Sequence, residues 1–339
     1  MKALQVEKPG VISVVEREMP TVANDDDVLV KIKAAGICGS DVHIYHGNSP
    51  VATYPRVVGH EMVGEVVEVG SSVVRVAIGD RVVVEPMINC GECYGCKSGR
   101  PNACSNLQVR GCHVDGGFQE YFVAPAKAIF KFDPTLDYTT AAMIEPYTIA
   151  AQITWRADIR KDDFVFIMGA GPIGLCVLEM AKLKGGRCIV SDYNTARLKI
   201  AEDLGADYIL NPTDGDVLDA VREITGGMGS NVTIDAVCLP KTFEQVVEIT
   251  SVAGRVMCLG FTKDVSEIAQ LGITLKELDI RGSRHQTYKF KEVVELFNQR
   301  ALHPEKLISH VMPFNEVQIA LDLIDNKPHE VCKIVLKFD

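Results

Sequence analysis

Four cysteines at close, regular spacing could hold a metal ion. They follow the pattern C-x2-C-x2-C-x7-C in a segment rich in glycine and lysine, residues 89–106: Cys90, Cys93, Cys96 and Cys104. Four thiolates form a closed tetrahedral site, the usual structural arrangement for zinc. An iron–sulfur cluster is the main alternative, but the bacterial ferredoxin pattern continues with x3-C-P, and no proline follows Cys104. The spacing therefore predicts a zinc ion that holds a loop and does not react.

A second set of candidate metal ligands is dispersed along the chain. Cys38 lies in the sequence Gly-Ile-Cys-Gly-Ser-Asp-Val-His, His60 and Glu61 follow Val-Gly, and Glu145 lies in Met-Ile-Glu-Pro. Taken singly, these residues have ordinary explanations as a core thiol, a hydrogen-bonded imidazole and an acid at a helix N-terminus. Their flanking residues strengthen the joint interpretation as ligands of a second metal ion.

A glycine-rich turn has the composition of a dinucleotide-binding loop. A predicted strand, Phe164–Met168, runs directly into a Gly-x-Gly-x-x-Gly motif and then into a predicted helix. In such loops the first glycine allows a tight turn, the second lets the backbone approach a pyrophosphate, and the third permits close contact between helix and strand. The helix N-terminus then faces the phosphates. The residues expected to bind the cofactor here are Gly169, Gly171, Pro172, Ile173 and Gly174.

An acidic residue after the next strand favours NAD over NADP. Asp192 lies 21 residues after Gly171, where a carboxylate accepts hydrogen bonds from the adenosine ribose and repels a 2′-phosphate. Arg197 could instead serve a 2′-phosphate, although its position in a predicted helix favours a surface role. The alternative for the whole motif is a tight turn without a ligand.

The elements that position these residues change character along the chain. Up to about Tyr147, short β-branched runs alternate with glycine, proline and aspartate, as in Val28–Ile32, Met62–Val69 and Arg81–Val84, which predicts an all-β lobe. From Asp163 onward, strands and helices alternate, which predicts a parallel doubly wound sheet. The expected strands are Phe164–Met168, Arg187–Ser191, Tyr208–Leu210, Val232–Ala236 and Val256–Gly260, and the expected helices are Ile173–Lys184, Thr195–Leu204, Val217–Thr225 and Thr242–Ser251.

The end of the chain is expected to return to the first lobe. After Arg284 the pattern predicts a helix, a loop, a second helix and a strand at Cys332–Phe338, which is too little for a separate domain. The predicted fold is α/β in two domains. Residues 1–147 and 285–339 form the mostly-β domain, and residues 148–284 form the Rossmann domain with the doubly wound parallel sheet.

Composition excludes several classes of protein. The 339 residues carry a formal net charge of −10, whereas nucleic-acid binders present a basic face. Residues 1–10 lack the apolar run of a signal peptide, and the longest apolar stretch, residues 164–178, falls short of the ~20 residues of a membrane span. We therefore expect a cytoplasmic protein, with no membrane or nucleic-acid partner and with reduced cysteines. Six of the eleven are expected to be small core residues, with Cys112 as the exception if it lies near the substrate loop: Cys112, Cys176, Cys188, Cys238, Cys258 and Cys332.

The order of these motifs resembles a known family. Gly36–Asp41, Gly59–Glu61, the four-cysteine segment, Gly79–Val82 and Gly169–Gly174 are similar to the zinc-containing medium-chain dehydrogenases, and the resemblance runs end to end. It implies a GroES-like catalytic domain beside the Rossmann domain. The residues around the second ligand set are most similar to the polyol and sugar-acid branch, which includes sorbitol and threonine dehydrogenases, and within it to bacterial starvation-sensing oxidoreductases and aldonate 5-dehydrogenases.

The resemblance also implies roles at a catalytic centre. Cys38, His60 and Glu61 would bind a catalytic zinc ion, and Glu145 would be an alternating ligand or the partner of zinc-bound water. Together with the four-cysteine site, this gives two zinc ions per chain.

Three further residues match supporting roles in that family. Asp41 matches the carboxylate that orients the ligating histidine and so fixes its tautomer and basicity. Ser40 and His43 match a proton relay from the substrate hydroxyl toward solvent. Because zinc acts as a Lewis acid, a bound alcohol can lose its proton to Ser40 and pass hydride to NAD+, giving a ketone.

Substrate identity follows from the resemblance. The first choice is a sugar acid oxidised at C5, such as L-gulonate, L-idonate or L-galactonate, and a neutral polyol such as sorbitol is the alternative. Arg110, His113 and Arg284 are candidates for binding hydroxyls or a carboxylate.

The non-enzyme alternative is a catalytically inactive binding or regulatory protein. The resemblance further implies a homo-oligomer, a dimer or tetramer, commonly formed through the Rossmann sheet edge near Val256–Phe261 and Leu275–Arg281.

Overall fold

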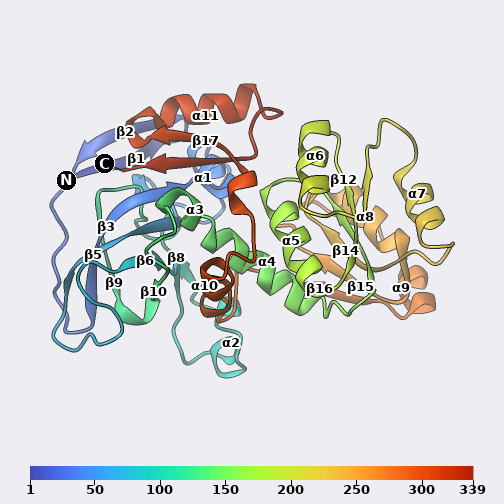
Figure 1. The fold of residues 1–339 in the computed structure, drawn as a ribbon, viewed down its shortest axis with the longest axis horizontal. Helices are drawn as coiled ribbons and strands as arrows, with labels where there is room; N and C mark the ends of the chain where they lie inside the picture. The colour runs from blue at the N-terminus through green and yellow to red at the C-terminus, as the bar shows by residue number, and fades with distance from the viewer. Residues whose placement is uncertain (339) are drawn as a thin grey trace. The chain divides into compact units, whose positions relative to one another are not determined.

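Two sheets of different kinds organise the chain (Figure 1). The computed structural model describes residues 1–338, and its contacts divide them into two units. Unit 1 holds residues 1–145 and those from Thr287 onward, and unit 2 holds Pro146–Gln286. The chain therefore crosses between units at 145/146 and 286/287, each two residues from the expected boundary.

Unit 1 is built on a mostly antiparallel core sheet with strands from both ends of the chain. Its main sheet has the order β10-β6-β5-β3-β18-β17, and β9 also pairs with β3. Two smaller sheets have the orders β2-β1-β4 and β7-β8. The strands are β1 (Lys2–Lys8), β2 (Val11–Glu16), β3 (Asp27–Gly36), β4 (Arg56–Val57), β5 (Glu61–Val69), β6 (Arg81–Val84), β7 (Met87–Ile88), β8 (Gln108–Val109), β9 (Tyr121–Pro125), β10 (Ile129–Lys131), β17 (Ile308–Pro313) and β18 (Lys333–Lys337).

The expectation of an all-β lobe is wrong in detail, because short helices interrupt the strands. Within that lobe these helices are α1 (Gly39–Tyr45), α2 (Tyr94–Lys97) and α3 (Tyr138–Ala141). The two helices predicted after Arg284 are confirmed as α10 (Phe290–Asn298) and α11 (Val317–Asn326). Four 3-10 turns lie at Pro101–Ala103, Ala126–Ala128, Pro304–Lys306 and Phe314–Glu316. Helix α4 (Ile144–Arg156) begins in unit 1 and continues into unit 2. Helices as short as α2 and α3 offer too few residues for a recognisable apolar periodicity.

The chain's C-terminal strand joins the core of unit 1, as the sequence pattern predicted. Strand β18 pairs antiparallel with β3 and parallel with β17, so segments from the two ends of the chain lie side by side (Figure 1). The core includes Leu4, Ile32, Met62 and Phe118, each less than 2% exposed. Strand β17 was expected as a loop. Its residues are alternately half-buried and exposed along one sheet edge, so it lacks the continuous apolar run of a central strand.

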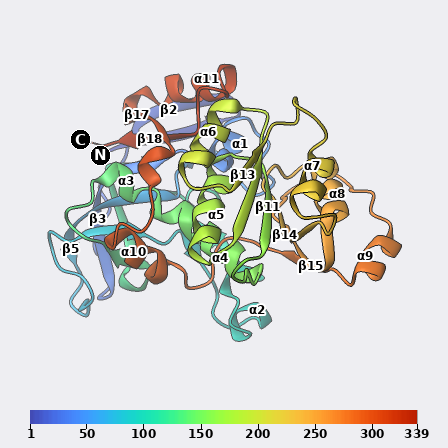
Figure 2. The ribbon, with the colours of Figure 1, turned by 45° about the vertical axis from the view of Figure 1, so that its right-hand side comes forward.

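Unit 2 is a parallel, doubly wound sheet with the strand order β13-β12-β11-β14-β15-β16, which is the Rossmann order. Figure 2 shows α5 and α6 on one face of this sheet and α7 and α8 on the other. The strands are β11 (Phe164–Met168), β12 (Arg187–Ser191), β13 (Tyr208–Leu210), β14 (Ser230–Asp235), β15 (Thr250–Cys258) and β16 (Asp279–Gly282), and the helices are α5 (Pro172–Leu183), α6 (Thr195–Asp203), α7 (Val217–Ile224), α8 (Pro240–Ile249) and α9 (Gln270–Lys276).

Most of these elements follow the predicted alternation, with two differences. The expected helix Thr242–Ser251 ends at Ile249, because Thr250 and Ser251 already belong to β15. Helix α9 was not expected, and β16 was expected only as part of the sheet edge near Leu275–Arg281 that the family resemblance implied. Local capping explains the helix starts: Asn194 accepts hydrogen bonds at the start of α6, and Pro172 occupies the first turn of α5.

Among residues 1–338, no helix combines the length and apolar character needed to cross a membrane. The same residues contain eleven free cysteines. Of the six expected in the core, Cys176 and Cys188 are buried, whereas the other four are only half-buried.

Candidate catalytic centre, structural metal site and dinucleotide loop

Three of the expected zinc ligands lie together in unit 1. Candidate ligand atoms of Cys38, His60 and Glu61 all lie within 4.8 Å of one another. Cys38 caps the start of α1 just after β3, and Glu61 begins β5. Because β3 and β5 pair antiparallel with Gly36 opposite Glu61, residues far apart in sequence reach the same end of the sheet.

A buried carboxylate ties the two ligand-bearing segments together. Asp41 accepts a hydrogen bond from the backbone N–H of Cys38 through Oδ2, at 2.9 Å, and one from the backbone N–H of Gly59 through Oδ1, at 3.0 Å. The same Oδ1 lies 3.7 Å from Nδ1 of His60. Asp41 therefore faces the histidine as expected, and it also fixes the backbone on both sides of the cluster.

One ring nitrogen of His60 has no hydrogen-bond partner among the described residues. Its Nδ1 is buried and makes no hydrogen bond with any residue in the described range 1–338. Burial lowers the pKa of His60, but negative charge at Cys38 and Asp41 outweighs this effect and raises the pKa well above its usual range. A site that draws positive charge in this way, with thiol, imidazole and carboxylate donors, fits a zinc ion.

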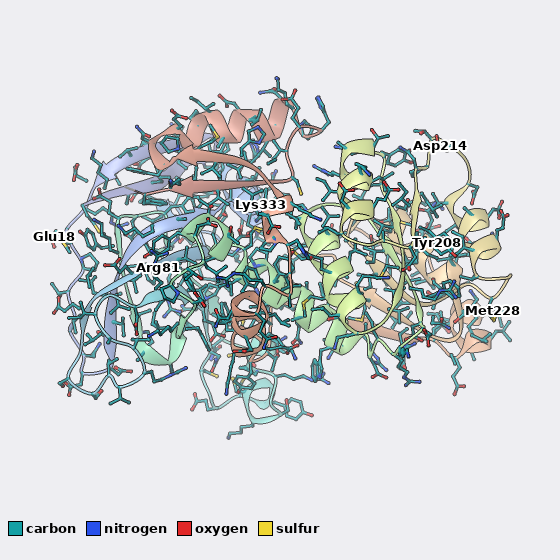
Figure 3. The ribbon with its side chains drawn as sticks, viewed as in Figure 1. Glu18, Arg81, Tyr208, Asp214, Met228 and Lys333 are labelled. Atoms are coloured by element: carbon teal, nitrogen blue, oxygen red, sulfur yellow. The ribbon has the colours of Figure 1, made fainter. Side chains whose placement is uncertain are left out.

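Glu61 has a buried partner that the sequence analysis did not identify. Its Oε1 and Oε2 accept hydrogen bonds from Nζ of Lys333 at 2.6 and 2.7 Å, and both side chains are buried. Figure 3 labels Lys333 in the C-terminal strand region of unit 1. The two residues are 272 positions apart, so no local motif could have paired them.

Two more titratable groups lie near this cluster. Glu145 is buried in the first turn of α4, and burial raises its pKa to about 7, with charges at His60 and Lys333 opposing the shift and Glu61 adding to it. Cys112, on the loop after β8, has its pKa raised to about 11 by burial. Both carry electrostatic interactions with His60, which places them close to the three candidate ligands.

The two residues of the expected proton relay lie on α1. Ser40 is half-buried and His43 is exposed. Positions three apart lie on the same face of a helix, so the two residues share a face of α1, and a proton relay through them stays a prediction.

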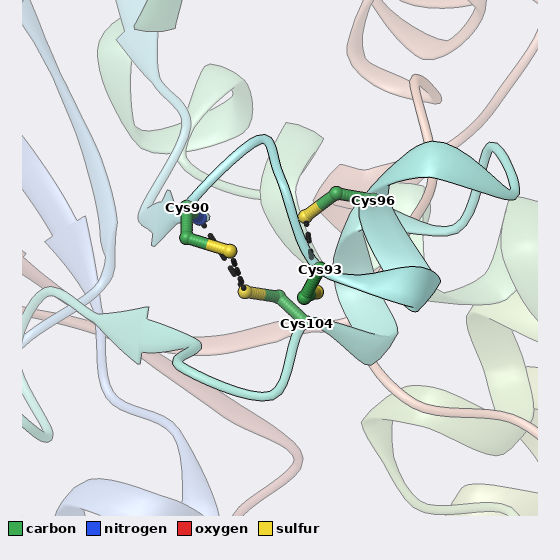
Figure 4. A group of neighbouring side chains, drawn as sticks. All are labelled: Cys90, Cys93, Cys96 and Cys104. Carbon is green, nitrogen blue, oxygen red and sulfur yellow. Dashed lines mark hydrogen bonds between the residues drawn. The ribbon is translucent and has the colours of Figure 1, made fainter.

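The four cysteines of the first motif form a separate cluster (Figure 4). The Sγ atoms of Cys90 and Cys104 are 3.4 Å apart, and those of Cys93 and Cys96 are 3.6 Å apart. Four sulfurs around one zinc ion with bonds of ~2.3 Å would be separated by roughly 3.8 Å, so the observed spacing is close to that of a closed zinc site.

Backbone amides stabilise the thiolate form in this cluster. N–H groups of Cys96 and Ser105 donate to Cys93 and lower the pKa of its thiol to about 5. The N–H of Asn106 donates to Sγ of Cys104 at 3.3 Å. Because thiolates are the form that binds zinc, these contacts prepare the loop for a metal ion.

The glycine-rich loop of unit 2 has the geometry that its sequence predicted. Gly169 has φ +102°, a conformation that side chains disfavour. A Cβ at Gly174 would lie 1.9 Å from the carbonyl oxygen of Gly169, whereas a Cβ at Gly171 would meet nothing within 4 Å. Gly174 therefore sets the contact between helix and turn, and the open side at Gly171 leaves room for a ligand. Pro172 and Ile173 form the first turn of α5 beside it.

Asp192 closes this loop from the neighbouring strand. Its Oδ2 accepts a hydrogen bond from the backbone N–H of Ala170 at 2.7 Å, and its Oδ1 accepts one from Asn194 at 2.8 Å. The carboxylate is thus held beside the loop, with lone pairs left for a ribose. Arg197 lies in the first turn of α6, where its backbone N–H donates to the side chain of Asn194.

The three candidate substrate residues lie in different surroundings. Arg110 is buried, donates to the carbonyls of Glu85 and Met87 at 3.2 and 3.4 Å, and so supports the loop that carries it. His113 accepts a hydrogen bond from the backbone N–H of Val109 at Nδ1, which places the proton of the neutral ring on Nε2. Arg284 is exposed in unit 2, with its guanidinium 5.9 Å from the ring centre of Phe261. A part for any of them in substrate recognition stays a prediction.

Comparison with known proteins gives the family. The family model of the alcohol dehydrogenase GroES-like domain matches residues 24–134, and that of the zinc-binding dehydrogenases matches residues 172–299. The chain belongs to the zinc-binding alcohol dehydrogenase family. This is the family that the order of the sequence motifs indicated, and its members are oxidoreductases.

Relatives of this alcohol dehydrogenase cover its whole length. It is 42% identical to the starvation-sensing protein RspB of Escherichia coli K12, over 100% of this chain and 99% of the relative. It is 34% identical to L-galactonate-5-dehydrogenase of the same strain, with the same coverage. A crystal structure of an rspB alcohol dehydrogenase from E. coli CFT073, complexed with NADH, superposes with a TM-score of 0.94 at 41% identity, covering 100% of this chain and 99% of that one.

The four-cysteine cluster gives a first prediction for this alcohol dehydrogenase. Replacing Cys104 by Ser should lower the zinc content from two ions to one per chain, because a closed site needs all four thiolates. Metal analysis of the purified protein measures this directly. Cys258→Ser, at a half-buried cysteine outside both clusters, should keep two zinc ions. Two zinc ions in Cys104→Ser would contradict the assignment.

A second prediction concerns the glycine-rich loop. Gly174→Ala places a methyl group against the carbonyl of Gly169 and forces the start of α5 away from the turn. NADH affinity, measured by fluorescence titration, should fall by at least about tenfold. Zinc content should stay at two ions per chain, because both clusters lie in unit 1. Unchanged NADH affinity would show that the loop does not hold the dinucleotide.

Proposed function

We propose that this alcohol dehydrogenase oxidises a secondary alcohol of a sugar acid to a ketone, with NAD+ as the hydride acceptor. The observation that carries the proposal is the convergence of Cys38, His60 and Glu61 within 4.8 Å, separate from the four-cysteine cluster. A closed site of four thiolates suits a structural zinc, whereas three mixed ligands leave a position for substrate. A zinc ion held there supplies Lewis-acid polarisation of a bound alcohol.

Residues of α1 would move the alcohol proton. Ser40 lies two residues after the proposed ligand Cys38 and is half-buried, which supports its hydroxyl as the acceptor of the alcohol proton. His43 lies on the same helical face and is exposed, so it would pass the proton to solvent. Asp41 accepts hydrogen bonds from the backbone of Cys38 and Gly59, and so it keeps the start of α1 and the segment before His60 in fixed positions during this transfer.

Asp192 would select NAD. Its carboxylate is fixed beside Gly169–Gly174 by two backbone amides, where it can accept hydrogen bonds from ribose hydroxyls. A 2′-phosphate at this position would meet a negative charge. The NADH complex of the rspB structure supports the same choice of cofactor.

The choice of a sugar acid rests on a relative and on a set of basic residues. The L-galactonate-5-dehydrogenase at 34% identity acts, by its name, on an aldonate at C5. We infer an aldonate for this chain too, with L-gulonate, L-idonate and L-galactonate as candidates. Arg284 and His113 remain the candidates for binding hydroxyls or the carboxylate, and Arg110 supports the loop that carries His113.

A substrate panel tests this proposal. Each aldonate is incubated with NAD+, and NADH formation is followed by absorbance, in parallel with sorbitol, L-threonine and simple primary alcohols. An aldonate should give a kcat/KM at least about tenfold above that of every neutral polyol, because an arginine pairs strongly with a carboxylate. Turnover of sorbitol alone would identify a polyol dehydrogenase, and turnover of primary alcohols alone would refute both assignments.

His60→Ala is the control for the same assay. It removes a zinc ligand but leaves the glycine-rich loop of unit 2 untouched, so aldonate oxidation should disappear while NADH affinity stays within about twofold of the parent value. Activity close to that of the parent enzyme would contradict the assignment of the catalytic centre. Absence of turnover in the parent, with one zinc ion per chain, would favour an inactive binding protein.

We further propose that the chain forms a homo-oligomer through the edge of the unit 2 sheet. Strand β16 is the last strand of that sheet, and exposed apolar side chains lie on and beside it: Phe261, Val265, Leu271, Leu275 and Ile280. An edge strand with such neighbours is suited to pairing with a second copy.

The oligomer is tested by introducing charge at the edge. Ile280→Asp should lower the molar mass from light scattering to that of a single chain, because a charge at a buried interface is costly. Val74→Asp, at an exposed residue of unit 1, should leave the mass unchanged. A parent protein that is already a single chain, or an Ile280 variant with the parent's mass, would refute the proposal.

A further inference from the structure

We propose that Lys333 is a positioning residue that competes with zinc for the carboxylate of Glu61. In this arrangement Glu61 is a weak, exchangeable ligand of the catalytic metal. The inference rests on the proposed function only in placing a zinc ion between Cys38 and His60. It starts from the ion pair in which one ammonium takes both oxygens of a candidate zinc ligand.

The ammonium of Lys333 is fully engaged. Its Nζ donates to Oε1 and Oε2 of Glu61 at 2.6 and 2.7 Å and to the carbonyl oxygen of Ile37 at 3.1 Å. An ammonium has three donors, so these three contacts use all of them. The side chains of Lys333 and Glu61 are only 4% and 2% exposed, which leaves water little part in the pair.

The strand register brings the two charges together. Strand β3 lies between β5, which begins at Glu61, and β18, which begins at Lys333. Gly36 ends β3, pairing with Glu61 on one side and with Val335 on the other. A Cβ at Gly36 would lie 1.9 Å from Oε2 of Glu61. Because Gly36 has no side chain, the carboxylate of Glu61 has room to reach Lys333.

The same carboxylate faces the metal ligands. A Glu61 oxygen lies within 4.8 Å of the ligand atoms of both Cys38 and His60. The carboxylate thus has two possible partners, the ammonium and a cation at the cluster. Each contact with Lys333 weakens the donor strength of the oxygen toward zinc, and the positive charge of the lysine also opposes a second cation nearby.

A buried lysine that served only the fold would have a different effect. Its loss would leave a buried carboxylate unpaired and destabilise unit 1, and it would affect metal binding only through the loss of a nearby positive charge. If Lys333 competes with zinc, its loss leaves Glu61 with the metal as its remaining partner of opposite charge. The two roles therefore differ in the lifetime of the bound catalytic zinc.

The test measures zinc release to a chromogenic chelator from the full-length zinc enzyme, without substrate. The release phase of the catalytic site is identified as the one that His60→Ala lacks. Lys333→Met should slow this phase by about tenfold or more, whereas Lys333→Arg, which keeps the charge, should release zinc at nearly the parent rate. Lys337→Met, at the exposed end of the same strand, is the matched control.

A double-mutant cycle shows whether the effect passes through Glu61. In a Glu61→Gln background, Lys333→Met should slow zinc release much less than it does in the parent, because the competing carboxylate is gone and only the repulsion between the lysine and the metal is removed. Cobalt substituted at the catalytic site should show a shifted visible absorption band in Lys333→Met alone, reporting a changed ligand set. If Lys333→Met is not folded, Lys333→Gln is measured by the same criteria.

The outcomes separate this proposal from the proposed function. Equal release rates in the parent and Lys333→Met, with two zinc ions in each, overturn the competition and leave the catalytic site intact. Slowing of the same size in Glu61→Gln also overturns it, because the effect then bypasses the carboxylate. A parent enzyme with only the four-cysteine zinc overturns the catalytic zinc site and the competition together.

Discussion

The candidate catalytic centre depends on one buried carboxylate, that of Asp41. It accepts backbone hydrogen bonds from Cys38 and Gly59, and so it joins the loop after β3 to the loop before β5. Hydrogen bonds to a charged acceptor are stronger than those between neutral groups. The same carboxylate faces His60, which places negative charge beside a candidate ligand whose Nδ1 has no hydrogen-bond partner among the described residues. The carboxylate of Asp41 therefore both positions the candidate ligands and supplies negative charge beside them.

The two units divide the chemistry between them. Unit 1 gathers the candidate catalytic ligands at one end of an antiparallel sheet and keeps the four cysteines in a separate loop. Unit 2 supplies the glycine-rich turn and Asp192 at the carboxyl ends of adjacent parallel strands, where this fold binds its cofactors. Each site is thus built from the geometry of its own sheet.

Local features of the fold and the site could be predicted from sequence. Strand β11, the turn that follows it and the four-cysteine loop depend on neighbouring residues, and their spacing specifies them. Weakly patterned elements escaped prediction: β16 and β17 are edge strands, and the seven residues of α9 include no buried side chain. Such elements carry little hydrophobic periodicity.

Contacts across long sequence separations could not be predicted. Lys333 meets Glu61 only because β18 returns to pair with β3, and nothing near either residue specifies that pairing. The buried contacts of Arg110 with two backbone carbonyls likewise arise from the folding of its loop against β7, although an arginine in sequence alone indicates an anion. For both side chains, tertiary context decides the partner, whereas for the cysteine and glycine motifs local spacing does so.

The central claim is that the chain holds two zinc ions with different roles, one of them among mixed ligands open to substrate. Anomalous diffraction at the zinc edge, from crystals of the purified enzyme, measures this most directly. The account predicts two peaks per chain, one among the sulfurs of Cys90, Cys93, Cys96 and Cys104 and one in contact with Cys38 and His60. A single peak among the four cysteines, in protein shown to be saturated with zinc, would contradict it.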